Sequence, residues 1–522
     1  MLYTTSDVKA ALAELPFSAF AAAAGVLIFV AFLIREFKSW YRLKHIPGPF
    51  LNGISSFPMV RMAGSGRMCF QMRELGNRYG PLVRIGPNEV VFGDADTFRM
   101  ITGARSPFVK SPWFGASRHL PDQHSIVSMS DEDEHKIMKG KLAPGYSDKE
   151  ASGSFETGVD KYVATFIDLI ERKYISTSMD YRPMEFSHKA QYFALDVITE
   201  VGFGEAFGFL TNDRDMYQYV EINDTYLPVL VMLLELPFFD NVLRTWPMNK
   251  LAPTAGDDYG YGKLMGLMTD IVDKRLKPDA EQGNDMLASH IRSGLNRKEL
   301  LAEVFVKVMA GADSTAMAIR MMLLFLLTTP TALSTLRAEI DDRVASGQIS
   351  SPFITHAEAN SFPYLQAVVK ETLRLYPPIT GHNYKLVPAG GATILGHFLP
   401  AGTQIGLNHV QMLRNKKVFG ADAEIFRPER WVEADGTRFK EMSANVDLVF
   451  SHGKYYCLGR NLAQIEMNKV VAELVRRFDF TIADPVVPIT VKDCAFWVCS
   501  DFWVRVTRRE KARMYPNSGC SC

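Results

Sequence analysis

The stretch from Phe450 to Arg460, Phe-Ser-His-Gly-Lys-Tyr-Tyr-Cys-Leu-Gly-Arg, constrains the fold of this chain more than any other segment. Two glycines, Gly453 and Gly459, flank Cys457, and an amphipathic run follows from about residue 462 to 477. This pattern predicts a tight loop that opens into the N-terminus of a helix. Backbone N–H groups and the positive helix end stabilise a thiolate and lower its pKa from the free value of about 8.5. The glycines favour a large flat ligand that approaches the backbone closely, whereas a buried structural cysteine is the alternative interpretation.

Composition bounds the class of protein. The chain has 522 residues, of which 47% are hydrophobic, so it can bury a large core as one big domain or two. Its 58 basic and 58 acidic side chains balance, which argues against a nucleic-acid-binding surface. Six cysteines lie without a Cys-x-x-Cys pair, a pattern typical of a reducing compartment rather than a disulfide framework.

The N-terminal part predicts a membrane anchor. Residues 15–34 carry no formal charge, and as a helix they are about 30 Å long, just enough to span a bilayer. Basic residues are denser after this run than before it, so the positive-inside rule places the rest of the chain in the cytosol. A cleaved signal peptide and a buried helix are the alternatives. The predicted organisation is a lumenal segment (1–14), an anchor (15–34), a basic and proline-rich hinge (35–49), a catalytic domain (50–510) and a disordered tail (511–522).

A second landmark lies inside a long helix predicted from about Arg297 to Thr328, capped by Asn296 and ended by Pro330. At its middle stands Ala310-Gly-Ala-Asp-Ser-Thr315. The small residues leave room beside the helix, and an acid followed by hydroxyls can carry protons. Packing of small residues between helices is the alternative interpretation.

Other segments are assigned from local pattern. Residues 82–85 and 89–92 predict a hairpin, residues 185–275 a series of helices, and residues 480–506 strands. Glu371 and Arg374 stand at i, i+3 on a helix that Pro377 terminates.

These segments together resemble the cytochrome P450 family. Phe450, Gly453, Cys457 and Gly459 match the haem-binding pattern Phe-x-x-Gly-x-Arg-x-Cys-x-Gly, but Tyr455 stands where the family usually has arginine. The run 310–315 is similar to the oxygen-binding motif, with serine in place of the usual threonine, and Glu371 to Arg374 is similar to Glu-x-x-Arg. The style of the cysteine loop resembles fungal secondary-metabolite members.

The resemblance implies a mainly helical fold with small β-sheets and a haem b cofactor. It implies Cys457 as the axial ligand of the iron, proton delivery by Asp313 and Ser314 with Thr315, and a buried ion triad of Glu371, Arg374 and Arg430. It assigns the haem propionates to Lys139, Lys385 and Lys454, with His135 as a further candidate. The cofactor-binding set is Cys457, Phe450, Gly453, Lys454, Gly459, Lys139, His135 and Lys385, and the expected substrate pocket is Trp113, Phe305, Met309, Ile379 and Phe496.

The implied function is a monooxygenase that oxidises a hydrophobic small molecule in the endoplasmic reticulum membrane. The sequence has no dinucleotide-binding fingerprint, so electrons are expected from a separate NADPH–cytochrome P450 reductase. Two alternatives stay open. One is a haem-thiolate isomerase or dehydratase that needs no reductase, and the other is a membrane-anchored haem- or lipid-binding protein without turnover.

Overall fold

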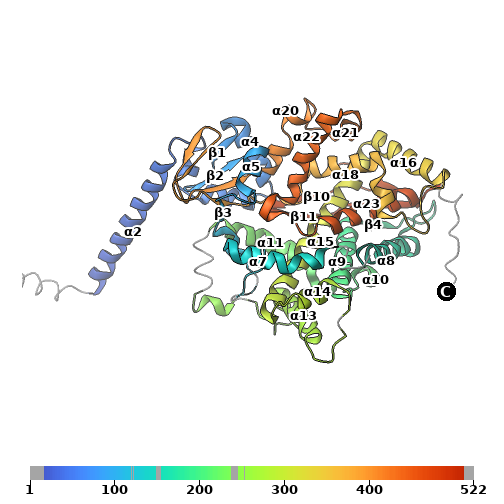
Figure 1. Ribbon diagram of the computed structural model, residues 1–522, viewed down its shortest axis with the longest axis horizontal. Coiled ribbons are helices and arrows are strands. Elements are labelled where there is room, and N and C mark those ends of the chain that lie inside the picture. The colour runs from blue at the N-terminus through green and yellow to red at the C-terminus, as the bar shows by residue number, and fades with distance from the viewer. Residues whose placement is uncertain are drawn as a thin grey trace, which may run out of the picture.

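The computed structural model describes residues 17–118, 120, 123–147, 154–236, 245–251, 253–281 and 283–510, and this part of the chain is mainly helical with small sheets (Figure 1). The longer helices are α2 (Phe17–Arg42), α4 (Met68–Tyr79), α7 (Glu132–Leu142), α8 (Ser154–Leu169), α9 (Phe186–Phe203), α11 (Tyr219–Leu234), α13 (Gly260–Arg275), α15 (Arg297–Thr328), α16 (Pro330–Ala345), α18 (Pro363–Leu375), α22 (Gly436–Val446) and α23 (Arg460–Arg477). The shorter helices are α3 (Phe57–Gly64), α5 (Ala95–Thr102), α6 (Trp113–Ala116), α10 (Phe209–Asn212), α14 (Met286–Arg292), α17 (His356–Asn360), α19 (His409–Leu413), α20 (Lys416–Phe419) and α21 (Glu429–Glu433).

The strands form one larger sheet and three small ones in the described chain. The strands are β1 (Leu82–Arg84), β2 (Glu89–Phe92), β3 (Val109–Lys110), β4 (Pro183–Glu185), β5 (Lys385–Leu386), β6 (Ala392–Ile394), β7 (His397–Leu399), β8 (Gln404–Leu407), β9 (Phe478–Ile482), β10 (Thr490–Cys494), β11 (Phe496–Ser500) and β12 (Trp503–Arg508). The larger sheet has the order β1-β2-β8-β5-β3, in which β1 and β2 form the predicted hairpin and β8 runs parallel to β2.

Helix α15 is the central element, and its bounds confirm the sequence prediction. Asn296 caps it: the N–H of Glu299 donates to Asn296 Oδ1 at 3.1 Å, and the N–H of Asn296 donates to Glu299 Oε2 at 2.7 Å. This reciprocal capping box satisfies backbone donors that the first helical turn leaves free. Helix α9 packs along α15, and a side chain at Gly311 would collide with Ile198 of α9 at 2.7 Å. Gly311 therefore permits the close approach of the two helices.

The predicted ion triad is present and buried. Arg374 donates from Nε and Nη2 to the two carboxylate oxygens of Glu371 at 2.8 and 2.7 Å, and Arg430 Nε donates to Glu371 Oε1 at 2.8 Å. Trp431 Nε1 adds a fourth bond at 2.9 Å. Burial alone would raise the pKa of Glu371, but the two guanidinium groups outweigh it and hold the pKa below its usual value. The triad ties α18 to the segment that leads into the cysteine loop.

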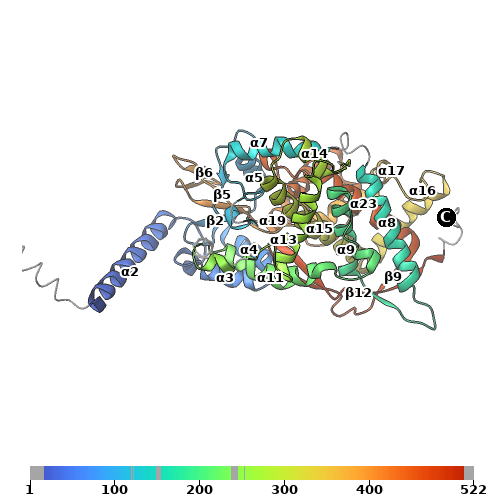
Figure 2. The same cartoon turned by 90° about the horizontal axis from the view of Figure 1, so that it is seen from below.

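The N-terminal helix α2 projects from the body beside the larger sheet in both views (Figures 1 and 2). The predicted anchor begins at residue 15, outside the described residues, and the helix continues through Arg42 rather than ending at residue 34. Leu27, Phe29 and Ile34 of α2 are exposed. Among the described residues, one helix has the length and composition to cross a membrane, α15, and 67% of its apolar window is buried inside the protein. Membrane anchoring by α2 stays a prediction, and the tail at 511–522 lies outside the described residues.

Candidate active site

A cavity of about 340 Å³ lies between α15 and the loop that carries Cys457. Helix α15 contributes its wall along one face, with positions spaced by three or four residues. The residues that line the cavity include, from α15, Glu303, Val306, Lys307, Ala310, Gly311, Ser314, Thr315 and Ala318, and from the loop and α23, Phe450, Ser451, Tyr455, Tyr456, Cys457, Leu458, Gly459, Leu462 and Ala463. The two landmarks of the sequence therefore meet across one space.

The loop around Cys457 is held in one conformation by its own backbone. The N–H of Cys457 donates to the carbonyl of Phe450 at 2.8 Å. Gly453 has a φ of +59°, and a Cβ there would collide with the carbonyl of Thr102, so both backbone angle and space require glycine. Of the four cysteines in the described chain, Cys457 is exposed, because its side chain opens on the cavity, and the other three are buried.

The start of α23 acts on the Cys457 sulfur. Although the Cys457 side chain opens on the cavity, the protein that surrounds its sulfur raises the pKa of the thiol, while the N–H groups of Gly459 and Arg460 and the charge of Lys139 act against this rise. Lys139 Nζ donates to the carbonyls of Lys454 and Tyr456 at 2.8 and 3.0 Å, so its ammonium group is fixed beside the loop. This arrangement suits a sulfur that becomes a thiolate when a cation binds it.

Four basic or imidazole side chains line one edge of the cavity: Lys110, His135, Lys139 and Lys385. Lys110 of β3 and Lys385 of β5 are directly paired across two antiparallel strands, and both are buried. Lys110 Nζ donates to the carbonyls of Ile126 and Val127 at 2.7 and 2.9 Å, and Lys385 Nζ donates to the carbonyl of Asn383 at 3.0 Å. Within the described residues, neither lysine forms an ion pair with a carboxylate.

Comparison with known proteins identifies the family of this chain. The family model for cytochrome P450 matches residues 47–496. The chain is 38% identical over 476 residues to cytochrome P450 monooxygenase ABA1 of Pyricularia oryzae, covering 90% of this chain and 93% of the relative. It belongs to the cytochrome P450 family. It is also 36% identical to cytochrome P450 monooxygenase aba1 of Botryotinia fuckeliana over 90% of this chain and 92% of that protein, and 29% identical to mfmA of Annulohypoxylon moriforme over 88% and 92%. The protein is therefore an enzyme, a cytochrome P450 monooxygenase.

The residues of this P450 fit the haem that family membership implies. Lys110 and Lys385 lie directly opposite each other and are buried, and burial lowers the pKa of both, to about 7 for Lys110. An anion bound beside them would stabilise the charged form of both side chains. The propionate carboxylates of haem are such anions. Cys457 supplies the soft sulfur ligand that iron accepts, and the small residues of α15 leave room for a flat group.

Several predicted residues take other places in this P450. Lys454 is not among the lining residues: its Nζ donates to the carbonyls of Ser106 and Phe108 and pairs with Glu132 at 3.0 Å, so it does not face the cavity. Lys110 lines the propionate edge instead and was missed in the sequence. His135 lies at this edge, but burial and the neighbouring lysine charges lower its pKa to about 3, so it is a neutral ring there.

The five residues expected in the substrate pocket do not all line this cavity. Ile379 lines the cavity, whereas Trp113, Phe305, Met309 and Phe496 are not among its lining residues. Phe305 packs against Tyr261, with ring centroids 6.2 Å apart, and lies on another face of α15. In three cases the residue that follows the predicted one lines the cavity instead: Phe114 after Trp113, Val306 after Phe305 and Ala310 after Met309.

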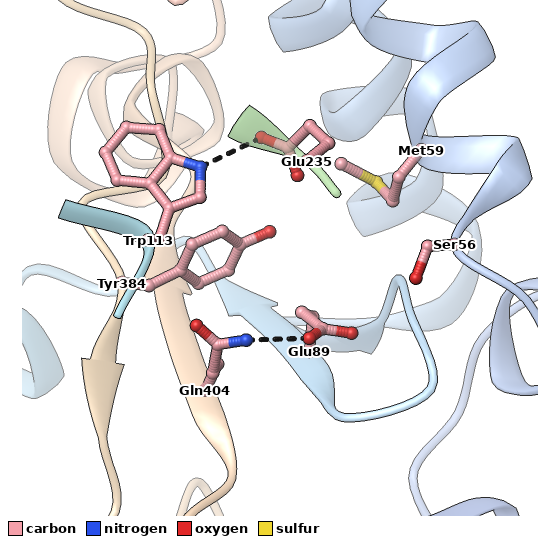
Figure 3. Close-up of a pocket in the computed structure, with 7 residues that line it drawn as sticks. All are labelled: Ser56, Met59, Glu89, Trp113, Glu235, Tyr384 and Gln404. Carbon is pink, nitrogen blue, oxygen red and sulfur yellow. Dashed lines mark hydrogen bonds between the residues drawn. The ribbon is translucent and has the colours of Figure 1, made fainter. Parts of the chain in front are cut away.

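Trp113 lies in a second, much smaller pocket (Figure 3). Its indole Nε1 donates to Glu235 Oε1 at 3.3 Å, and burial raises the pKa of Glu235 to about 8. The Tyr384 ring lies between this pair and Glu89, which accepts a hydrogen bond from Gln404 at 2.7 Å. Trp113 therefore joins α6 to the end of α11, rather than contacting a ligand in the larger cavity.

Asp313 is turned away from the cavity. Its carboxylate oxygens accept hydrogen bonds from Gln191 Nε2 at 2.7 Å and Asn223 Nδ2 at 3.1 Å. Ser314 and Thr315 line the cavity, and Ser314 Oγ donates to the carbonyl of Ala310 at 2.6 Å. The acid and the hydroxyl thus stand on different faces of α15.

Burial makes Asp313 a source of pH-dependent stability. It raises the pKa of Asp313 to about 7, above the value of about 3.9 expected in an unfolded chain. Between these two values the folded state holds a proton that the unfolded state has lost, so the free energy of unfolding falls as the pH rises through this window. We expect Asp313→Asn to become more stable relative to the wild type at about pH 8 than at about pH 5 in denaturant titrations. A stability difference equal at both pH values would contradict the assignment.

Proposed function

We propose that this cytochrome P450 is a membrane-anchored haem-thiolate monooxygenase that oxidises a hydrophobic small molecule in a secondary-metabolite pathway, using electrons from a separate NADPH–cytochrome P450 reductase. The observation that carries the proposal is the placement of Cys457 and Ser314 in the walls of one cavity. The relatives named cytochrome P450 monooxygenase support the reaction class.

The cavity supports an apolar substrate. Apart from the basic edge, many of the side chains that line it are hydrocarbon, among them Phe98, Phe114, Ile126, Val306 and Ile379. An apolar ligand gains free energy when it leaves water for such a lining, by about 25 cal/mol for each Å² buried. The proposed site therefore selects by shape and apolar contact.

The residues of this chain have distinct roles in the proposed reaction. When bound, haem would supply the redox chemistry that activates molecular oxygen. Cys457 would hold the iron through its thiolate, and Ser314 presents its hydroxyl oxygen at the cavity wall while its proton is donated to the carbonyl of Ala310. Asp313 holds a proton behind that wall, and its pKa of about 7 makes both protonation states accessible near neutral pH.

The proposal is tested in membranes that contain the protein together with an NADPH–cytochrome P450 reductase. A reduced carbon monoxide difference spectrum first establishes thiolate ligation. Metabolites that accumulate in a strain lacking the protein are then supplied as substrates, under heavy-isotope oxygen gas. We expect a product that carries one heavy oxygen atom, or is otherwise oxidised, with consumption of NADPH and oxygen.

Two other results would overturn the proposal. Turnover that continues without NADPH and oxygen would identify an isomerase or dehydratase. Saturable binding of the metabolite, with an intact thiolate spectrum and no turnover at any reductase concentration, would identify a binding protein. Membranes carrying Cys457→Ser serve as the matched control, because this variant lacks the proposed iron ligand.

A further inference from the structure

Tyr455 occupies the position where the family pattern has arginine, and it is surrounded by cations. The ammonium of Lys385 lies 4.3 Å from the centroid of its ring, that of Lys454 lies 5.3 Å away, and that of Lys110 lies 5.6 Å away. The imidazole of His135 meets the same ring edge-on, with centroids 5.5 Å apart. The ring is thus a shared contact for Lys385 and Lys110 of the propionate edge, for the neutral imidazole of His135 and for Lys454 behind the edge.

The hydroxyl of Tyr455 is tied to the first turn of α7. It donates to Glu132 Oε1, which also accepts the N–H of Lys110 at 3.3 Å. Glu132 Oε2 pairs with Lys454 at 3.0 Å. Burial raises the pKa of Glu132, but the bonds from Tyr455 and Lys454 outweigh it and keep the pKa below the usual value. One carboxylate therefore joins α7, β3 and the cysteine loop.

The Tyr455 ring helps to hold the ammonium group of Lys385. Its ammonium lies between two aromatic faces, 4.6 Å from the centroid of Phe114 and 4.3 Å from that of Tyr455. An ammonium is attracted to the negative face of an aromatic ring, and the attraction is stronger where water is excluded. Burial and the charge of Lys110 lower the pKa of Lys385 well below its ordinary value, and the two ring faces oppose this loss of charge.

We propose that Tyr455, held by Glu132, is a positioning residue that keeps the ammonium groups of Lys385 and Lys110 at the edge of the cavity, where they bind the haem carboxylates in place of the usual arginine. The inference rests on the proposed function for the presence of haem. It adds that the lysines of two strands, Lys110 and Lys385, are held at this edge by an aromatic ring, whereas an arginine would supply its charge from the loop itself.

The proposal separates two parts of Tyr455, its hydroxyl and its ring. Tyr455→Phe removes the bond to Glu132 and keeps the ring, and Glu132→Gln weakens the same bond from the other side. Tyr455→Leu removes both. Glu134→Gln is the matched control, because Glu134 is an exposed acid in the same helical turn.

Haem loss from the purified holoenzyme to an excess of apomyoglobin measures retention. We expect Tyr455→Phe and Glu132→Gln each to release haem about tenfold faster than the wild type, because each loses a hydrogen bond to a charged group. The double variant should release haem about as fast as Glu132→Gln alone, since Glu132→Gln already removes the charge that accepts the Tyr455 bond, together with the ion pair to Lys454. Tyr455→Leu should release haem several-fold faster again, and Glu134→Gln should match the wild type.

The midpoint potential of the haem iron distinguishes two roles for Tyr455, the positioning of lysine charge and simple packing. If the ring holds the ammonium groups beside the haem carboxylates, Tyr455→Leu shifts the potential downward, because positive charge that stabilises the reduced state moves away. An unchanged potential in Tyr455→Leu, or equal haem loss from Glu132→Gln and Glu134→Gln, would overturn the proposal. An intact thiolate spectrum in those variants would leave the monooxygenase function standing, whereas a wild-type protein without a thiolate spectrum would refute both.

Discussion

Replacement of Cys457 with serine is expected to abolish the long-wavelength Soret band of the reduced carbon monoxide complex and to remove monooxygenase activity. A serine hydroxyl does not ionise at neutral pH, so it cannot replace the thiolate that donates electron density to iron. Changes to groups behind metal ligands already cost about 10- to 100-fold in affinity or activity, and loss of the ligand itself should cost more. Difference spectra and turnover in reductase-containing membranes measure the effect.

The control for this change is Cys494→Ser. Cys494 is buried at the end of β10 and is not among the residues that line the cavity, so its replacement should leave the spectrum unchanged. A Cys457→Ser protein that keeps the wild-type band and activity would show that another group binds the iron. The contrast between the two variants isolates ligation from a general effect of losing a thiol.

The sequence predicts elements whose cause is local. The capping box at Asn296 and the proline after Thr328 define α15 from residues within one turn of its ends. The conformation of the cysteine loop also has a local cause, because the positive φ at Gly453 is an angle that glycine adopts readily. Glu371 and Arg374 are neighbours on one helix, so their pairing is also readable from spacing alone.

Lys110 was missed because its role depends on a partner far along the chain. It lies in a two-residue strand, and its cross-strand neighbour Lys385 follows 275 positions later. No periodic pattern marks such a short strand. The available signal was a lysine set between Phe108 and Trp113, since a cation among large apolar residues is typical of a buried charge with a partner.

The face of α15 could not be assigned from pattern. The helix is buried on most sides, so apolar residues surround it and the 3.6-residue period carries little information. Phe305 and Met309 are the residues expected in the substrate pocket, whereas Val306 and Ala310 line the cavity. The same limit applies to Lys454, whose direction in an irregular loop is set by Glu132 and by two carbonyls before α6.

Glu371→Gln is expected to destabilise the folded protein by about 3–5 kcal/mol, because it leaves the guanidinium groups of Arg374 and Arg430 buried without their shared counter-charge. The matched control is Arg427→Ala. Arg427 forms ion pairs with Asp422 and Glu433 nearby, but its side chain is 35% exposed, so its loss should cost about 0–1 kcal/mol. Urea titration of the two variants, followed by the thiolate spectrum, compares them directly.

The position of the triad adds a second expectation for Glu371→Gln. Because Glu371 also accepts hydrogen bonds from the N–H of Arg427 and from Trp431, its replacement loosens the segment that leads into the cysteine loop. Haem retention should therefore fall together with stability, although Glu371 is not among the residues that line the cavity. An unfolding midpoint equal to that of Arg427→Ala would mean that the buried pair contributes no more than a surface one. Fast haem loss from a Glu371→Gln protein of wild-type stability would instead show that Glu371 affects the cysteine loop by a route other than the stability of the fold.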